Sequence, residues 1–423
     1  MARPRAAQES PLKTQAPTLA PTPQTSARVA SWMAAMCAAL LAGAPAQAQE
    51  GNEARATLAP GKGFTLQRED KTASINVKGR TQLRATFAQE GEADATDEVQ
   101  VRTVRLTTQG YVWRPEVRFL TQFAFGGNDF EKDNASPVFD AWVEYGGWRD
   151  AQVRVGQFFV PFDRARTTRE FALQFVERAA TLRDLTLDRD VGVMLWSSDL
   201  FGLDQWLGYN LFLGGGEGRH RFGPQELGPL VVGRVTLRPF GGFEEEQEGD
   251  LARSPTPKLA LALAGGYNHQ TNRLQSTYGP TFTAGRVDYT HAAADLQLRW
   301  RGLSVLAEVL YKGASDELLV AEVEGSRVEE ATRAGWGWLA QAGYMLTQEL
   351  ELVGRAERSY AAQGTDPKLV EQAQTQGQQL GGGLNLYLNG HALKVQTDYF
   401  YTFGPSAASL DRHAVRLQVD ASF

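Results

Sequence analysis

The last eleven residues of the chain alternate between two kinds of side chain up to the final position. One face carries His413, Val415, Leu417, Val419, Ala421 and Phe423, and the other carries Ala414, Arg416, Gln418, Asp420 and Ser422. A period of two residues predicts an extended strand. Such a strand needs partners along both edges, because an open edge is a liability in water and cannot be tolerated in lipid. The pattern therefore predicts the closing strand of a barrel.

The other end of the chain has the pattern of an export signal. Arg28 precedes an apolar run from Val29 to Ala44, which is followed by the small-x-small sequence Ala46-Gln47-Ala48. We interpret residues 1–48 as a secretory signal peptide. The alternative is a transmembrane anchor, but the run is shorter than the roughly 20 residues that a spanning helix needs. Cys37, the only cysteine, lies inside this run, so we expect no disulfide in the mature chain.

Charge and hydropathy narrow the class further. Four of the 43 basic and one of the 49 acidic residues lie in residues 1–48, which leaves 39 basic and 48 acidic residues and a formal charge of −9. This charge argues against a nucleic-acid partner. The mean hydropathy of −0.34 is that of a water-soluble protein. A transmembrane barrel is compatible with that value, because its strands alternate apolar and polar residues.

Further alternating segments predict about sixteen strands, a number typical of transmembrane barrels. In the clearest segment, residues 74–87, Val77 and Leu83 share one face while Gln82 lies on the other. Short turns such as Arg301-Gly302 alternate with long polar connections, which we place together at the outer end of the barrel. These long connections are residues 240–256, 271–286, 312–333 and 359–378.

The sequence therefore predicts an all-β fold, a transmembrane antiparallel β-barrel of about 16 strands. We assign residues 71–423 to the barrel and residues 49–70 to an N-terminal periplasmic extension or hairpin. A soluble β-sandwich also alternates, but it rarely has this many strands in one undivided chain.

One connection departs from the strand rhythm. Residues 158–189 lack alternation, and residues 169–183 have helix-like spacing that places Phe171 and Phe175 near one face. A connection of this length between two strands favours a functional role. We expect it to fold back into the barrel as a long inserted constriction loop, because its many apolar side chains do not suit a freely solvated loop.

A series of motifs runs through the middle of the chain. They are Asp140-Ala-Trp-Val-Glu-Tyr145, Val153-Arg-Val-Gly-Gln-Phe-Phe-Val-Pro-Phe162, Gln174-Phe-Val-Glu-Arg178 and Asp188-Arg-Asp-Val-Gly-Val193, with residues 110–115 before them and 338–344 after them. In order and spacing the chain resembles the phosphate-selective porins of the O and P type. The resemblance implies a sixteen-stranded, usually trimeric barrel whose third loop, here residues 158–189, folds into the pore.

The same resemblance implies location in the bacterial outer membrane, with lipid and lipopolysaccharide around the barrel. It implies passive diffusion of small hydrophilic solutes, in particular anions such as phosphate, through a homotrimer. In the best-known members a ladder of lysine and arginine side chains binds the anion. Arginine suits this task because its planar fork matches an oxyanion.

Nine basic residues are candidates for lining the pore and binding anions. By strand parity or by position in the inserted loop they are Lys78, Arg80, Arg84, Arg105, Arg118, Arg154, Arg164, Arg166 and Arg169. The inserted loop together with Asp190 is formally neutral, however, because its six arginines are matched by six acidic residues between Asp163 and Asp190. These charges could instead form ion pairs that hold the loop to the wall.

Enzymatic functions find little support in the sequence. The five histidines show no close metal-binding spacing. We therefore expect no catalytic residue, no metal site and no cofactor. One alternative to a porin is an outer-membrane-embedded hydrolase, which needs a nucleophile, a base and an orienting group on one face. Another is a non-channel barrel that serves as an adhesin or scaffold and is plugged by residues 158–189.

Overall fold

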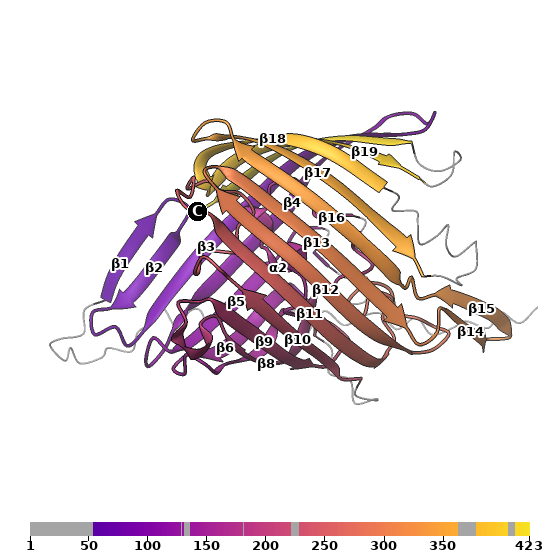
Figure 1. The fold of residues 1–423 in the computed structure, drawn as a ribbon, viewed down its shortest axis with the longest axis horizontal. Helices are drawn as coiled ribbons and strands as arrows, with labels where there is room; N and C mark the ends of the chain where they lie inside the picture. Colours follow the sequence, from indigo (N-terminus) through magenta and orange to yellow (C-terminus); the bar gives the residue numbers. More distant parts are fainter. Residues whose placement is uncertain are drawn as a thin grey trace, which may run out of the picture. The chain divides into compact units, whose positions relative to one another are not determined.

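The computed structural model describes residues 54–423 except 128, 131–135, 181, 221–227, 363–377 and 405–410 (Figure 1). The predicted signal peptide, residues 1–48, lies outside the described residues. Sixteen antiparallel strands form a closed ring, because the last strand, β20 (Arg412–Ser422), pairs with the first, β3 (Ser74–Glu90). The predicted all-β barrel of about sixteen strands is confirmed. No helix in the described part of the chain is long and apolar enough to cross a membrane.

The other barrel strands follow in chain order. They are β4 (Thr96–Tyr111), β5 (Val117–Ala124), β6 (Val138–Tyr145), β7 (Gln152–Phe159), β8 (Arg189–Ser197), β9 (Leu207–Gly214), β10 (Leu230–Leu237), β11 (Lys258–Thr271), β12 (Val287–Trp300), β13 (Leu303–Ala314), β16 (Gly335–Met345), β17 (Leu350–Ala361), β18 (Gln378–His391) and β19 (Leu393–Phe403). A 3-10 turn, η2 (Leu200–Gly202), lies between β8 and β9.

Two hairpins lie outside this ring. β14 (Leu318–Val323) and β15 (Ser326–Ala331) pair with each other and with no other described strand, in the connection between β13 and β16. β1 (Ala54–Ala59) and β2 (Gly63–Arg68) form an N-terminal hairpin. β2 pairs with residues 74–77 of β3, next to the place where β20 ends. The boundaries at 49–70 and 71–423 remain predictions.

The two faces of the wall differ in polarity, because successive residues of a strand point to opposite sides. In β3, the Leu83 side chain is 52% exposed, whereas Gln82 and Arg84 are 3% and 5% exposed. Exposed side chains on the other strands are also mostly apolar, and many of the inward positions carry polar and charged groups. This arrangement matches a barrel with lipid outside and a polar interior.

The wall is uneven in height. β5, β6, β7, β9 and β10 have 8 residues each and β8 has 9, so we call these six neighbouring strands the low wall. By contrast, β11 and β12 have 14 residues each and β3 has 17. The strands of the low wall are visibly shorter in Figure 1.

One long connection lies at the opposite end from the one predicted. The short connections, such as residues 301–302 between β12 and β13, mark the periplasmic end of an outer-membrane barrel. Residues 238–257 join β10 to β11 and lie at this same end, because strand directions alternate along the chain. The prediction that residues 240–256 form an outer loop is therefore wrong. The length of this connection suggested an outer position. The order of the strands, however, determines at which end of the barrel a connection lies.

The connection between β7 and β8, residues 160–188, folds into the barrel and is called the constriction segment below. Its described residues contain one short helix, α2 (Arg164–Thr167), and one 3-10 turn, η1 (Glu170–Ala172). The helix suggested by the spacing of residues 169–183 is absent from the described part of this segment. Carboxylates replace the helical acceptors: the backbone N–H of Gln174 donates to Glu248 (2.7 Å), and that of Val176 donates to Asp398 (2.9 Å).

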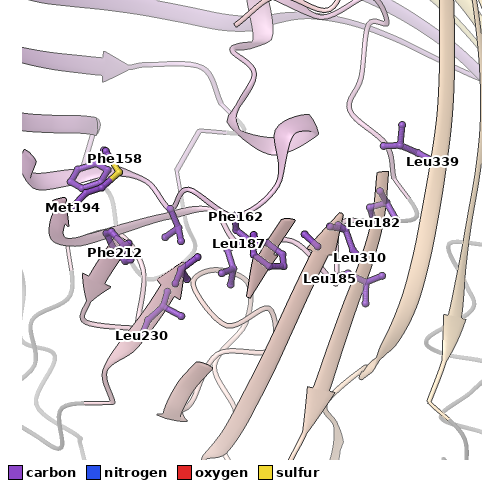
Figure 2. Packing of buried hydrophobic residues seen from close by; sticks show 14 of the residues in the cluster. Phe158, Phe162, Leu182, Leu185, Leu187, Met194, Phe212, Leu230, Leu310 and Leu339 are labelled. Carbon is purple, nitrogen blue, oxygen red and sulfur yellow. The ribbon is translucent and has the colours of Figure 1, made fainter. Parts of the chain in front are cut away.

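Apolar packing explains why this segment turns inward. Phe162, Leu182, Leu185 and Leu187 of the segment are at most 3% exposed and belong to one cluster with the inner faces of β8, β9, β10, β13 and β16 (Figure 2). The wall residues of this cluster include Met194, Phe212, Leu230, Leu310 and Leu339. Burying each large apolar side chain stabilises the fold by roughly 1.5–3 kcal/mol. A projecting loop would lose this contribution.

Candidate functional site

A cavity of about 550 Å³ lies on the outer side of the constriction segment. Arginine dominates its lining, with Arg84, Arg102, Arg105, Arg166, Arg169, Arg178, Arg183, Arg189, Arg219, Arg412 and Arg416. The acidic residues in the lining are Asp129, Asp163, Glu170, Glu177 and Asp188. We call this cavity the arginine chamber. Its eleven arginines outnumber its five acidic residues, so the chamber is positively charged.

Three of these arginines gather around one aromatic ring. The guanidinium carbons of Arg105, Arg189 and Arg219 lie 4.6, 4.6 and 4.2 Å from the centre of the Phe139 ring. Each approach is within the range of a cation–π interaction. The ring thus helps to hold three like charges close together, which a cluster of arginines alone would resist.

Buried carboxylates hold other arginines from behind the lining. Asp140, which is 1% exposed, accepts hydrogen bonds from Arg189 (2.8 Å) and Arg169 (3.1 Å). Asp398 accepts one from Arg416 at 2.6 Å. These pairs orient the guanidinium groups, because a charge-assisted hydrogen bond is stronger and more directional than a neutral one.

Ion pairs fasten the constriction segment to the wall. Glu170 of the segment lies 3.0 Å from Arg105 of β4, and Glu177 forms an ion pair with Arg84 of β3. Burial alone would raise the pKa of Glu170, but Arg105 and Arg80 hold it well below its usual range. Glu177 behaves alike, since Arg84 and Arg102 outweigh burial and lower its pKa. Both carboxylates therefore stay ionised at neutral pH.

Ion pairs with the opposite arrangement, an arginine of the segment and an acidic residue outside it, also fasten the segment. Arg164 donates to Asp295 of β12 at 2.7 Å and to Glu245 at 2.5 Å. Arg166 instead pairs within the segment, with Asp188 at 2.6 Å. The interleaved charges seen in the sequence thus act largely as structural ion pairs, as one of the two sequence-based interpretations proposed.

The family assignment rests on a direct match. Residues 75–218, which include the low-wall strands β5–β9 and the constriction segment, match the family model of phosphate-selective porin O and P. The match covers the part of the chain that carries most of the motifs, and it supports the family predicted from the sequence. Together with the closed sixteen-stranded barrel, it indicates an outer-membrane porin. No curated protein sequence matches the chain at a significant level.

Solved structures share the fold of this porin. A Salmonella typhi OmpF complex with daunomycin is 13% identical, with a TM-score of 0.54 over 83% of this chain and 98% of that one. An anion-selective porin from Comamonas acidovorans is 10% identical, with a TM-score of 0.53 over 83% and 100%. The outer membrane channel DcaP of Acinetobacter baumannii is 14% identical, with a TM-score of 0.53 over 86% and 100%. At these identities the likeness concerns the barrel fold.

The nine predicted site residues of this porin do not form one cluster. Four of them line the arginine chamber, namely Arg84, Arg105, Arg166 and Arg169. The other five lie elsewhere in the lumen, and they are Lys78, Arg80, Arg118, Arg154 and Arg164. Their role in anion binding remains a prediction.

Those five residues are engaged with neighbouring side chains. Arg80 donates to both carboxylate oxygens of Asp420, at 2.9 and 2.6 Å. Arg118 and Arg154 share Glu144, at 3.1 and 2.7 Å. The Lys78 ammonium lies 5.1 Å from the ring centre of Phe171, and Arg164 is paired as described above. A continuous row of free cations along the early strands is therefore absent from these positions.

Several chamber residues were missed by the sequence analysis for identifiable reasons. Arg102 lies at a β-bulge, where the register of β3 and β4 shifts after Gln82, so strand parity assigns it to the wrong face. Arg219 comes from an outer connection, for which parity makes no prediction.

Arg178 of the constriction segment donates to the carbonyl oxygens of Ala165 and Thr168, and burial together with nearby Arg166 lowers its pKa to about 10.

Within the described residues, no group of three or more His, Cys, Asp or Glu side chains could hold a metal ion.

Proposed function

We propose that this porin lets small anions, phosphate among them, cross the outer membrane by passive diffusion. The observation that carries this proposal is the composition of the arginine chamber, with eleven arginines against five acids. Two further acids, Asp140 and Asp398, pair with lining arginines from behind, which leaves an excess of about four positive charges.

The mechanism is electrostatic filtering without covalent chemistry. A chamber with one dominant sign of charge and low-dielectric walls concentrates counter-ions. Guanidinium forks can replace part of the hydration shell of an oxyanion through paired hydrogen bonds. The negative charge of the whole chain does not oppose this effect, because charges more than a Debye length from the chamber are screened.

The reversal potential of single channels in a KCl gradient tests the proposal. Anion preference at low salt, with chloride current reduced by added phosphate, supports it. A channel that prefers cations at low salt contradicts anion selectivity and leaves the porin assignment intact.

We further propose that the porin is a homotrimer that packs through the low wall. Eight residues at about 3.4 Å each, tilted by about 40°, reach only roughly 20 Å, which is short of the apolar band of about 25 Å. The outward side chains of this wall are nevertheless apolar, with Val143, Leu211 and Leu213 each about 55% exposed. A neighbouring subunit would cover this surface without the mismatch that lipid would meet. Lipid and lipopolysaccharide would then contact the taller strands.

We also propose that export removes residues 1–48, leaving the N-terminal segment 49–70 and the barrel. N-terminal sequencing of the protein purified from outer membranes tests this cleavage site directly.

A plugged barrel is the second candidate function, and one observation favours it. The constriction segment contacts strands around the whole ring, from Arg84 of β3 to Glu308 of β13 and Asp398 of β19. Absence of conductance in correctly folded protein would support the plug and reject passive diffusion.

A further inference from the structure

The periplasmic connection between β10 and β11 enters the lumen. Within residues 238–257, Glu248 and Asp250 are only 6% and 2% exposed, although they belong to the most acidic stretch of the chain. The carbonyl oxygen of Gln247 accepts a hydrogen bond from Gln297 of β12 at 2.5 Å. The connection therefore lies against the inner wall, and we call it the inner connection.

The inner connection contacts the constriction segment at two places. At the first, Glu245 bridges Arg164 of the segment (2.5 Å) and Arg238 at the end of β10. At the second, the backbone N–H of Glu248 donates to the carbonyl oxygen of Ala172 at 3.2 Å. The Glu248 carboxylate accepts from the backbone N–H of Gln174 at 2.7 Å.

Gln174 makes several hydrogen bonds within residues 172–176 of the constriction segment, which we call its tip. It is 2% exposed. Its side-chain amide donates to Ser304 at 2.7 Å and to Glu351 at 2.5 Å, and accepts from Gln341 at 2.9 Å. Gln341 also donates to Glu248, at 2.8 Å. Glu248 of the inner connection thus joins the tip and Gln341 of β16 in one buried network.

We propose that Glu248 is a positioning residue that fastens the tip of the constriction segment, so that the inner connection sets the width of the pore from its periplasmic side. This inference rests on the proposed function, because it requires a conducting pore. A buried network of this kind is rigid when all its members are satisfied, and the loss of one acceptor leaves the others unpaired. Removal of the Glu248 carboxylate should therefore release the tip.

Single-channel conductance of Glu248→Ala and Glu246→Ala tests this role. The two variants remove the same charge from the same connection, but Glu246 is exposed, whereas Glu248 lies inside the network. We expect Glu248→Ala to raise conductance about twofold, with more frequent current fluctuations, and Glu246→Ala to behave as wild type. Equal effects of the two variants would mean that charge alone matters and would overturn the positioning role, as would wild-type conductance in both.

A reversible cross-link provides the second test. The backbone hydrogen bond from Glu248 to Ala172 (3.2 Å) places the two residues side by side, so we choose them for a pair of cysteines. In Ala172→Cys/Glu248→Cys, the reduced protein should conduct like Glu248→Ala, and oxidation should restore the wild-type value. Mass spectrometry verifies that the disulfide has formed. If the oxidised and reduced proteins then have the same conductance, the positioning role of Glu248 is refuted.

The outcomes separate this inference from the proposed function. If the wild-type channel prefers cations and Glu248→Ala shows the expected change, anion diffusion is rejected and the positioning role of Glu248 is supported. If the wild type does not conduct but Glu248→Ala does, the positioning role and the plugged barrel are both supported. If no form conducts, including the reduced double-cysteine protein, anion diffusion and the positioning role are both rejected.

Discussion

Neutralising two arginines of the chamber should weaken the preference of the channel for anions. Arg102 and Arg412 both line the chamber. Arg102 shares Glu177 with Arg84, so the tie between that carboxylate and the wall survives the loss of Arg102. The double variant Arg102→Gln/Arg412→Gln removes about half of the excess positive charge, while Glu177 keeps its ion pair with Arg84.

The size of the effect follows from Coulomb's law. In water, one charge about 10 Å from a passing ion contributes about 0.4 kcal/mol, which screening at 0.1 M salt reduces to about 0.15 kcal/mol. An excess of about four charges then gives about 0.6 kcal/mol, or roughly threefold enrichment of anions and threefold depletion of monovalent cations. The permeability ratio should be roughly eight in wild type and roughly three in the variant.

Reversal potentials measured across a KCl gradient below 0.1 M provide the assay. The same measurement near 1 M should show almost no selectivity in either protein, because the Debye length falls to about 3 Å. Arg114→Gln/Arg301→Gln, which changes two exposed arginines on the short periplasmic turns, serves as the charge-matched control. An equal loss of selectivity in the control, or none in Arg102→Gln/Arg412→Gln, would refute the assignment of the filter to the chamber.

Three further predictions concern the barrel and its inserted segment. Leu83→Arg places a charge on the lipid face near mid-strand and should destabilise the barrel by roughly 2–4 kcal/mol, whereas Gln89→Arg at the outer end should cost less than about 1 kcal/mol; equal urea midpoints would mean that the strand is misplaced. Leu211→Arg on the low wall should convert trimers to monomers in detergent, and Leu263→Arg on the taller β11 should leave the subunit count unchanged; trimers in both cases would contradict the proposed interface. Deleting the constriction segment should enlarge conductance, and a correctly inserted deletion variant with wild-type conductance would show that the segment does not narrow the pore.

The barrel could be predicted from the sequence because its determinants are local and periodic. The alternation in β3 places Leu83 outside and Arg84 inside without any knowledge of the partner strands. The inward fold of the constriction segment was likewise predictable, since Phe162 and Leu187 need an apolar surface to contact. These patterns can be recognised in the sequence because the polarity of each residue matches the surroundings of its own side chain.

The candidate site was less predictable because its charges are set by contacts between distant residues. Arg80 and Asp420 are 340 positions apart, and nothing in the sequence near either residue indicates that they pair. Residues 238–257 had the composition of a solvated loop, yet Glu248 is buried because Gln174 and Gln341 satisfy its carboxylate. Parity also fails at a bulge, as it did for Arg102.

The N-terminal hairpin has a consequence for how the ring closes. β20 pairs with β3 from Glu90 down to Arg80, and Phe423 adds backbone bonds to Gly79. β2 occupies the next stretch of the same edge, residues 74–77. Because the hairpin joins residues close in sequence, it can form before the distant β20 arrives. It then acts as a stop that prevents β20 from sliding further along β3, and a slide of one residue would turn every lipid-facing side chain of β20 into the lumen.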